Sequence, residues 1–578
     1  MIRRKMYKTR LFNRLRISVA ILLFSFIITG YSAAQTTWYS YQTGNWTDWR
    51  TWTTDPSGTT LINPTTTTPS SASNNTVVIL NGRMVTIQPS VPAITTVSFT
   101  IQEGAILDLT TNTNVHNFGT FSGSGFLRLS TATFPSFASG SFVDAGGGTV
   151  EYTNMAGFTP TQFTYNNLII NLNNSTDEFY YDNATTLIIN GDLTINRGML
   201  RIGRNNFGGA ARTVRIYGNT LVNANGQIQV GTRNYRHQIY MTGDLTNYGT
   251  VGFTSMSAPD YDSDPTEGCS DVYFNNNNAD QNILCYGTTV FYRIVISKGS
   301  DQTFVLNIDA DAPNRFYLYG RNNTQSSPPS PGPPNIPNNN ALGLLSGTVR
   351  LGTNISLPCL SYNAVYNIDE DAQLWIDDGS VTFTTTTNYS SIVVYGKLRT
   401  TGNAVLNANG SQGIILREFS NFIIESGAVT TPCLRTSAIA GVHRGAFYML
   451  GGSLTITGNN ANVNGLQALK AYASMTIPYP ENVFFMSGGT INITGSTTYW
   501  AMNPPPGGSG TYFSLLIGAD AKNVKLTGGT INITVPTNRN AYINSTAPLW
   551  NLNITSTSDT YSAQIMDYGG YGSPSLPV

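Results

Sequence analysis

The segment from residue 186 to residue 253 repeats one short pattern three times, and this repetition constrains the fold more than any other feature. Each copy alternates apolar with polar residues and carries a leading glycine, Gly191, Gly218 or Gly243, spaced by 27 and then 25 residues. One copy has an apolar face that it cannot bury alone, whereas stacked copies bury this face between them. The repeat therefore predicts a parallel β-helix, or β-solenoid, in which each copy forms one coil.

A second repeat lies in the C-terminal half of the chain. Three near-copies of a Gly-Gly-Thr-Ile-Asn-Ile-Thr string occupy residues 451–457, 488–494 and 528–534, 37 and then 40 residues apart. Alternation at period two is typical of a strand with one buried face. We expect the glycine pair to form a corner and the Ile pair to face the core. The spacing indicates a coil with an excursion, or two short coils.

The composition favours an all-β protein with uncharged polar surfaces. Charged residues make up only 11% of the chain, against about 25% in typical soluble domains. Apolar residues make up 40%, so the chain is not of the core-poor kind that stays disordered. After residue 34 we find no run of helical periodicity.

The formal net charge of zero conceals a basic N-terminus. The first 16 residues hold seven basic side chains and no acidic one, namely Arg3, Arg4, Lys5, Lys8, Arg10, Arg14 and Arg16. The rest of the chain has 31 − 7 = 24 basic against 31 acidic residues, a net charge of 24 − 31 = −7. Such a body lacks the basic surface that nucleic-acid binding needs, so no nucleic-acid partner is expected.

Residues 1–34 have the pattern of a secretory signal peptide. An apolar run at 17–30, too short to span a membrane, follows the basic segment, and Ser32, Ala33 and Ala34 are small residues suited to cleavage. The alternative is an uncleaved N-terminal anchor. We expect the mature chain to start at Gln35, to interact with a secretion machinery, and to be secreted or at the cell surface with no membrane span.

A tryptophan-rich segment, residues 35–75, follows at once. It contains Trp38, Trp46, Trp49 and Trp52, four of the seven tryptophans of the chain. The rings of Trp46, Trp49 and Trp52 suit contact with sugars, but the first coil of a solenoid also needs a cover for its apolar end. We favour the second interpretation, an aromatic-rich N-terminal cap.

The expected order of segments follows from these signals. It is a signal peptide at 1–34, the cap and a loop at 35–75, coils at 76–320, a Pro/Asn-rich loop or linker at 321–340, coils with the Gly-Gly repeats at 341–546, and the start of a further block at 547–578. Similar aromatic-led strands at 165–171, 291–297 and 549–555 open such blocks. Because the last is not followed by a coil, we expect a fragment of a longer protein.

The chain resembles a known group of surface proteins. The resemblance rests on residues 38–52 with their Gly-Asn-Trp string, on residues 77–87, and on the pairing of 165–171 with 189–198. These resemble the N-terminal region of large secreted surface proteins of Bacteroidetes, which are commonly exported by the type IX secretion system and in part serve adhesion or gliding. The resemblance implies export and a surface role. The C-terminal sorting domain usual in that group is not recognisable.

An acidic cluster and four cysteines are the candidate binding and cross-linking residues. Asp260, Asp262 and Asp264 offer oxygen ligands for Ca²⁺, but their spacing fits no EF-hand loop, and a solvated acidic turn is the preferred interpretation. No other cofactor is expected. An even number of cysteines in an exported chain indicates disulfides. The pairing that we expect is Cys269–Cys285 and Cys359–Cys433, and the alternative is four buried thiols.

No catalytic motif stands out. The histidines His116, His237 and His443 lie far apart, and no Gly-x-Ser-x-Gly or His-Glu-x-x-His string occurs. Parallel β-helices include pectate lyases and polygalacturonases, whose sites place carboxylates and basic residues on one face. In this chain the best such group is Asp377 and Asp378 with Lys397 and Arg399. Fold alone does not establish activity.

These observations lead to one preferred function and two alternatives. We expect a non-catalytic extracellular β-solenoid, a stalk or display surface of a cell-surface adhesin. The alternatives are a polysaccharide-binding module, and a polysaccharide lyase or glycoside hydrolase. An exposed aromatic ladder would favour sugar binding, and a groove of Asp, Glu and Arg would favour an enzyme. The partner is then an extracellular surface or a polysaccharide.

Overall fold

The computed structural model confirms an all-β chain. It describes residues 36–70, 75–205, 209–261, 265, 267–320, 340–360, 365–383, 391–408, 413–436, 445–458, 475–477, 480–494, 513–537, 540–556 and 559–565. In this part the only helices are two short 3-10 turns, η1 (Trp49–Thr51) and η2 (Ala521–Asn523). None of the described helices is long and apolar enough to cross a membrane. The signal segment and residues 321–339 lie outside the described residues.

The chain forms two compact units. Unit 1 holds Met1–Phe142 with Gly146–Val150, and unit 2 holds Val143–Ala145 with Glu151–Val578. In unit 1 one sheet contains β3 (Trp52–Thr53), β1 (Thr36–Ser40), β4 (Asn75–Ile79), β6 (Ser98–Ile101) and β8 (Thr120–Ser122). A second row contains β2 (Gly44–Asn45), β5 (Met84–Thr86), β7 (Ile106–Asp108) and β9 (Phe126–Leu129). All of these pairs are parallel except β1 with β3.

The expected aromatic cap is present in unit 1. Trp46 and Trp52 are buried, their rings meet edge to face at 4.9 Å, and Trp52 Nε1 donates to the Trp46 carbonyl at 2.9 Å. The Trp46 ring also stacks on Phe99 at 6.2 Å. These rings therefore form the core of the first coils, as an end cover requires.

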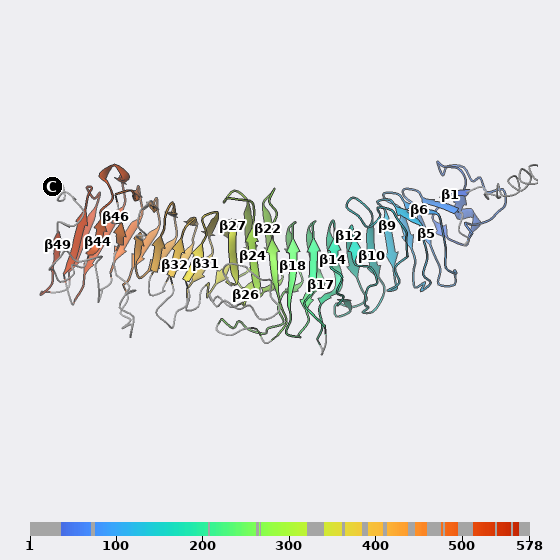
Figure 1. The fold of residues 1–578 in the computed structure, drawn as a ribbon, viewed down its shortest axis with the longest axis horizontal. Coiled ribbons are helices and arrows are strands. Elements are labelled where there is room, and N and C mark those ends of the chain that lie inside the picture. Colours follow the sequence, from blue (N-terminus) through green and yellow to red (C-terminus); the bar gives the residue numbers. More distant parts are fainter. Residues whose placement is uncertain are drawn as a thin grey trace, which may run out of the picture. The chain divides into compact units, whose positions relative to one another are not determined.

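The first half of unit 2 confirms that the glycine-led copies are coils. One row of parallel strands contains β11 (Thr164–Tyr165), β14 (Leu187–Ile189), β16 (Thr213–Ile216), β18 (Arg236–Met241), β21 (Cys269–Phe274), β24 (Arg293–Ser297) and the start of β27 (Leu342–Leu351). Leu187 pairs with Val214, and Val214 pairs with Ile239, one coil apart each time. Successive strands lie side by side in chain order (Figure 1).

The other side of these coils is a longer row of parallel strands. It contains β12 (Asn167–Asn171), β13 (Glu178–Tyr181), β15 (Leu193–Ile202), β17 (Thr220–Val230), β19 (Leu245–Asn247), β20 (Thr250–Gly252), β22 (Gln281–Cys285), β23 (Thr288–Phe291), β25 (Val305–Ala310) and β26 (Phe316–Leu318). Inward positions at every second residue, such as Leu193, Ile195 and Val222, are buried.

From β27 onward each coil has three sides. The first of these three rows continues the longer row described above, from the end of β27, which pairs with β25, through β30 (Ala372–Asp377), β33 (Lys397–Thr401), β36 (Asn421–Ile424), β39 (Ala446–Met449), β42 (Val483–Met486) and β45 (Val524–Leu526). The second contains β28 (Ser356–Leu357), β31 (Ser380–Thr382), β34 (Val405–Asn407), β37 (Ala428–Thr431), β40 (Ser453–Ile456), β43 (Thr490–Ile493), β46 (Thr530–Val535) and β48 (Leu552–Ser556). The third contains β29 (Val365–Ile368), β32 (Ser391–Val394), β35 (Gly413–Leu416), β38 (Leu434–Thr436), β41 (Met475–Ile477), β44 (Phe513–Ile517), β47 (Ala541–Ser545) and β49 (Ala563–Ile565).

The Gly-Gly repeats lie at corresponding places in successive coils. The second glycine of each pair, Gly452, Gly489 or Gly529, has a positive φ of 67°, 75° or 85°, and each precedes a strand of the second row. Ile491 and Ile493 are buried, as the repeat predicts. Since β42, β43 and β44 supply one strand to each side, the spacing of 37 and 40 residues corresponds to one coil and not to two short coils.

The predicted disulfides are wrong, because all four cysteines are described and none forms a disulfide. Cys269 begins β21 and Cys285 ends β22, and these two strands belong to different rows of the coil. Cys359 follows β28 and Cys433 follows β37, three coils later, which is about 14 Å along the stack. A disulfide needs Cα atoms within about 7 Å. The alternative of four buried thiols is correct.

The close stacking of the leading glycines gives a stability prediction. A Cβ on Gly218 would come within 2.4 Å of the Gly191 carbonyl carbon. We predict that Gly218→Ala lowers the free energy of unfolding by about 1–3 kcal/mol, because the coils must separate to admit the methyl group. Gly252→Ala is the matched control, since its Cβ meets nothing closer than 3.5 Å. Urea denaturation of both variants measures the effect, and equal midpoints would contradict the stacking argument.

Candidate functional site

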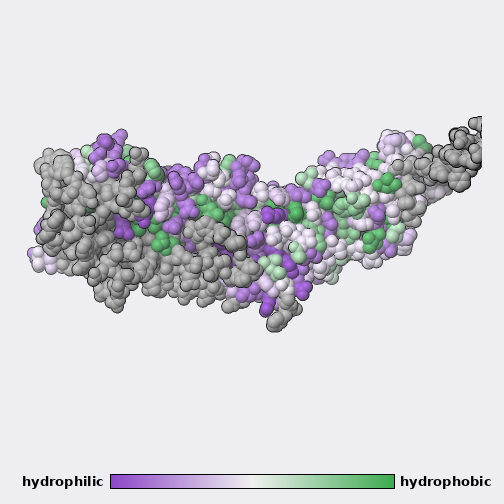
Figure 2. Space-filling view, in the orientation of Figure 1, coloured by the Kyte–Doolittle hydropathy of each residue, from purple (hydrophilic) through white to green (hydrophobic). Residues whose placement is uncertain are grey.

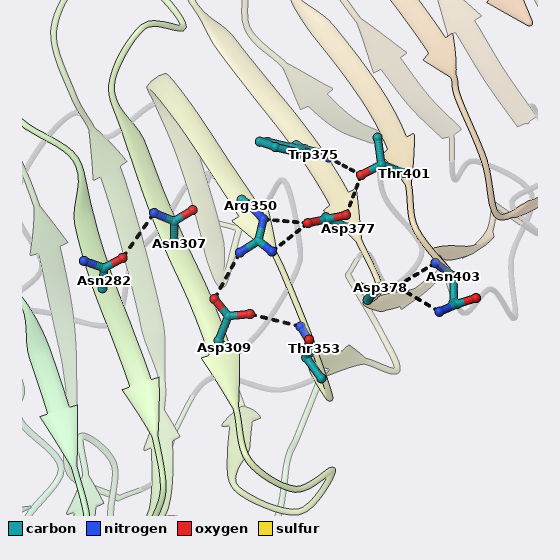
Figure 3. A network of polar contacts seen from close by, with 10 residues as sticks. All are labelled: Asn282, Asn307, Asp309, Arg350, Thr353, Trp375, Asp377, Asp378, Thr401 and Asn403. Carbon is teal, nitrogen blue, oxygen red and sulfur yellow. Dashed lines mark hydrogen bonds and ion pairs between the residues drawn. The ribbon is translucent and has the colours of Figure 1, made fainter. Parts of the chain in front are cut away.

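The most organised polar cluster of the described residues lies on the outer face of β25, β27, β30, β33 and β36. The register places Asn307, Arg350, Trp375, Arg399 and Ile423 in one column, one residue per coil. The residues next to them in each strand, such as Leu351 and Ile376, are buried, so the column itself points outward (Figure 3). We call these residues together with Asp309, Asp377, Thr401 and Glu425 the outer-face network.

Arg350 is the centre of the outer-face network. Its Nη1 lies 3.0 Å from Asp309 Oδ2 in the preceding coil, and its Nε donates to Asp377 Oδ2 in the following coil at 2.7 Å. Partial burial lowers the pKa of Arg350, but hydrogen bonds and charge from Asp377 and Asp309 outweigh this and raise the pKa overall. One guanidinium therefore links three coils (Figure 3).

Trp375 lies between two guanidinium groups. The carbon Cζ of Arg350 is 5.6 Å from the ring centroid and that of Arg399 is 4.4 Å, one from each neighbouring coil. Trp375 Nε1 donates to Thr401 Oγ1 at 2.6 Å, and Thr401 in turn donates to Asp377 Oδ1 at 2.6 Å. Each cation–π contact contributes about 0.5–1 kcal/mol at a partly exposed site. The faces of this ring are occupied by the protein itself.

Of the four residues that the sequence grouped as an enzyme-like cluster, Asp377 and Arg399 belong to the outer-face network, and Asp378 and Lys397 do not. Arg399 donates from Nε to Glu425 Oε1 at 2.8 Å. Asp378 has a φ of 62° at a corner, where its Oδ1 accepts from the backbone and side-chain nitrogens of Asn403 at 2.7 and 3.0 Å. Lys397 pairs in register with Gln373, two residues before Arg399.

Sequence reasoning identified only Asp377 and Arg399 of the outer-face network. It missed Arg350, Trp375 and Glu425, which contact Asp377 or Arg399 from neighbouring coils. It also missed Asp309, which contacts Arg350. A signal was available, since Arg350, Trp375 and Arg399 are 25 and then 24 residues apart, the length of one coil. Recognising it needs the coil register, which no single strand reveals.

The chemistry of the outer-face network is that of a brace. Asp377 accepts from Arg350 and Thr401, Asp309 contacts Arg350 and accepts the backbone N–H of Thr353 at 3.1 Å, and Glu425 accepts from Arg399. Hydrogen bonds between guanidinium groups and carboxylates are charge-assisted and stronger than neutral ones. Each of these side chains therefore connects neighbouring coils.

The remaining candidate residues fall in different places. Trp46 and Trp52 are buried in the cap, and Trp49 is half-buried with the Arg50 guanidinium 5.0 Å from its ring centroid. Asp260 is described, but Asp262 and Asp264 lie outside the described residues. No group of three or more His, Cys, Asp or Glu residues that could hold a metal ion occurs in the described part of the chain.

Two histidines serve as buried hydrogen-bond acceptors. His116 Nδ1 accepts the backbone N–H of Ile94 at 3.1 Å, and His237 Nδ1 accepts that of Arg212 at 2.9 Å. Burial lowers the pKa of each to about 4, and the positive charge of Arg212 adds to the effect at His237. The Nε2 atoms have no hydrogen-bond partner. Protonation of either histidine would therefore bury an unpaired charge. The third histidine, His443, lies outside the described residues.

A second charged cluster is buried. Asp271 Oδ1 accepts from Arg236 Nε at 2.9 Å, and Asp271 Oδ2 lies 3.6 Å from Arg293 Nη1. Arg293 Nε donates to the Asn340 carbonyl at 3.0 Å. The three charged side chains are at most 5% exposed. Removing one partner would leave a buried charge unpaired, which costs more free energy than breaking a partly exposed ion pair of the outer-face network.

Comparison with known proteins adds no assignment. No protein-family model matches the chain, and neither a curated protein nor a solved structure matches it. The function must therefore be argued from the residues described above.

The two charged clusters predict unequal losses. Asp271→Asn leaves two buried guanidinium groups without their carboxylate, and we predict a loss of roughly 3–5 kcal/mol in unfolding free energy. Asp309→Asn removes a partly exposed pair, and we predict a loss of about 1 kcal/mol or less. Denaturant titration of the two variants side by side measures the difference. Equal losses would show that burial does not set the strength of these pairs.

The buried histidines predict a dependence of stability on pH. Their folded pKa values of about 4 lie below the ordinary histidine value of 6.5, so the unfolded chain binds more protons between these limits and stability falls as pH falls through them. We predict a loss of roughly 2 kcal/mol per histidine between pH 6.5 and pH 5. The double variant with His116→Gln and His237→Gln should be less stable at pH 7, but its free energy of unfolding should depend less on pH over this range. An unchanged slope would contradict the assignment.

Proposed function

We propose that this chain is a non-catalytic extracellular β-solenoid, a stalk or display surface of a cell-surface adhesin. The signal-like N-terminus and the resemblance to Bacteroidetes surface proteins support export to the surface. The stacking of coils in unit 2 is consistent with a mechanical role, because each coil is joined to the next through parallel strand pairs.

The observation that carries this proposal is that outward polar side chains link coils to one another. The backbone nitrogen of Asp192 donates to Asn167 Oδ1 at 2.8 Å, that of Asn219 to Asp192 at 2.7 Å, and that of Asp244 to Asn219 at 3.0 Å. The ladder continues with Asn282, whose nitrogen donates to Asp244 Oδ1 at 2.8 Å. With the Arg350 brace further along, side chains reinforce the backbone ladder on the same outer column.

The composition of the surface also supports a structural role for the chain. On the face drawn in Figure 2, hydrophobic residues lie in small scattered groups among hydrophilic ones. Large exposed apolar patches mark binding sites more often than scattered residues do. The described carboxylates of the outer-face network are engaged with guanidinium groups, which supports a structural role over acid–base chemistry.

A polysaccharide-binding module is the second candidate, and one observation favours it. Tyr248 and Tyr286, in successive coils, are 49% and 39% exposed and stack at 4.6 Å with an interplanar angle of 6°. Tyr217 is 49% exposed as well. Exposed tyrosine rings offer apolar faces and hydroxyl groups of the kind that sugars contact.

A polysaccharide panel separates these functions. The purified chain is assayed for binding and, in the same samples, for release of reducing or unsaturated ends. We expect neither, because the carboxylates of the outer-face network are used within the protein. Release of product from any polysaccharide would refute the non-catalytic proposal. Binding that disappears in Tyr248→Ala and Tyr286→Ala, without product, would establish the second candidate.

Single-molecule pulling tests the load-bearing role itself. Arg350→Met removes the brace between three coils, so we expect unit 2 to unfold at lower force than the unmodified chain. Lys397→Met is the matched control, since Lys397 is a cation on the same outer face outside the outer-face network. Equal forces for all three proteins would count against the brace as a source of mechanical strength.

A further inference from the structure

The Gly-Gly repeats build a feature that the proposed stalk does not use. Four successive coils of the second row present Ser, Thr or Asn at three outward positions each. The rows are Ser453, Thr455 and Thr457; Thr490, Asn492 and Thr494; Thr530, Asn532 and Thr534; and Asn551, Asn553 and Thr555. We call these twelve residues the hydroxyl–amide grid. The strands that carry it, β40, β43, β46 and β48, lie in the C-terminal part of unit 2, where Figure 1 labels β46.

The register aligns the grid in straight columns. Ser453 pairs with Thr490 and Thr490 with Thr530, while Thr455 pairs with Asn492, Asn492 with Asn532, and Asn532 with Asn553. Leu454, Ile456, Ile491, Ile493, Ile531 and Ile533 alternate with the grid residues and are buried. The parallel pairs run without a bulge, so the twelve side chains stand on one regular surface facing outward.

The grid is uncharged and accessible. None of its twelve residues carries a charge, and Thr457, Thr494, Asn551, Asn553 and Thr555 are exposed while the others are half-buried. This differs from the outer-face network, where every coil from β25 to β36 contributes a charge to ion pairs. A ligand for the grid therefore needs neutral donors and acceptors rather than charge.

The amides of the grid are held in place by one another. Asn532 Nδ2 donates to Asn492 Oδ1 at 2.8 Å, and Asn553 Nδ2 donates to Asn532 Oδ1 at 3.0 Å. This ladder fixes the amide orientation along the column, so the threonines on either side of it flank an ordered central row. Little side-chain entropy is then lost when a ligand binds.

The spacing of the grid suits a lattice of water. Neighbouring strands are about 4.8 Å apart, and residues two apart on one strand are about 6.6 Å apart. Water oxygens hydrogen-bonded at about 2.8 Å in tetrahedral geometry have second neighbours at about 4.6 Å. Threonine adds a methyl group beside each hydroxyl, which restricts the water that contacts it. A rigid, neutral array with this repeat can hold water in positions that continue into a crystal.

We propose that the hydroxyl–amide grid is an ice-binding surface. The ligand is the face of an ice crystal, recognised by hydroxyl and amide groups repeated at the coil spacing. A neutral polysaccharide is disfavoured as occupant because the grid contains no aromatic ring to contact sugar faces. The proposal concerns a different face from the outer-face network and does not depend on the stalk function.

Ice recrystallisation and thermal hysteresis test the proposal. The purified full chain is frozen in sucrose solution, and the growth of ice grains is compared with that in a buffer control. We expect the chain to suppress grain growth and to give a gap between melting and freezing points. The double variant Thr494→Tyr and Thr534→Tyr places bulk on the grid, so both activities should be lost.

Thr246→Tyr is the matched control for that variant. Thr246 is a half-buried outward threonine of β19, away from the grid, and its variant should keep full activity. Circular dichroism on all three proteins checks that each keeps its β-structure. Absence of ice activity in the unmodified chain, or its retention in the double variant, would overturn the proposal. Grid-dependent binding to polysaccharides without ice activity would overturn it as well.

Discussion

Pairing between successive coils is the constraint on which the rest of the structure depends. In unit 2 a strand finds its hydrogen-bond partner one coil earlier or later, not within its own coil, as when Thr220 lies between Leu193 and Leu245. A coil that lost its neighbour would expose both its backbone groups and its apolar face. The same constraint explains the stacked glycines, since Gly218 sits directly against Gly191 and leaves no room for a side chain.

The features that repeat at the coil length could be predicted from the sequence. The glycine-led copies and the Gly-Gly strings indicate directly which residues align between successive coils. Gly489 and Gly529, for example, occupy the same corner one coil apart. The inward Ile residues follow from period two alone. The cap was predictable for a related reason: Trp46 and Trp52 gather where the first coil needs a cover, and both are buried there.

The features that depend on distances between coils could not be predicted in the same way. Cys269 and Cys285 are near in sequence, yet their strands belong to different rows of the coil, so proximity along the chain misled the pairing. The enzyme-like group was divided for a similar reason: Asp377 and Asp378 are adjacent, but Asp377 ends β30 and joins the outer-face network, whereas Asp378 lies at the corner beyond the strand and binds Asn403. Contacts of that kind need the register of each coil, and the unequal lengths of the coils hide it.

One outer column of unit 2 shows how such a scaffold can change its surface without changing its fold. The column begins as an Asn/Asp ladder, continues at Asn282 and Asn307, and becomes a stack of cations and rings at Arg350, Trp375 and Arg399. Most inward neighbours, such as Leu193, Leu245, Leu351 and Ile376, are buried aliphatic residues, so the core that sets the register changes little. Because each outward residue meets only its counterparts in adjacent coils, polar ladders, ion pairs and stacked rings are interchangeable solutions for holding coils together. A face without charged side chains, such as the hydroxyl–amide grid, holds its coils by backbone pairing and an amide ladder and keeps a neutral outer surface.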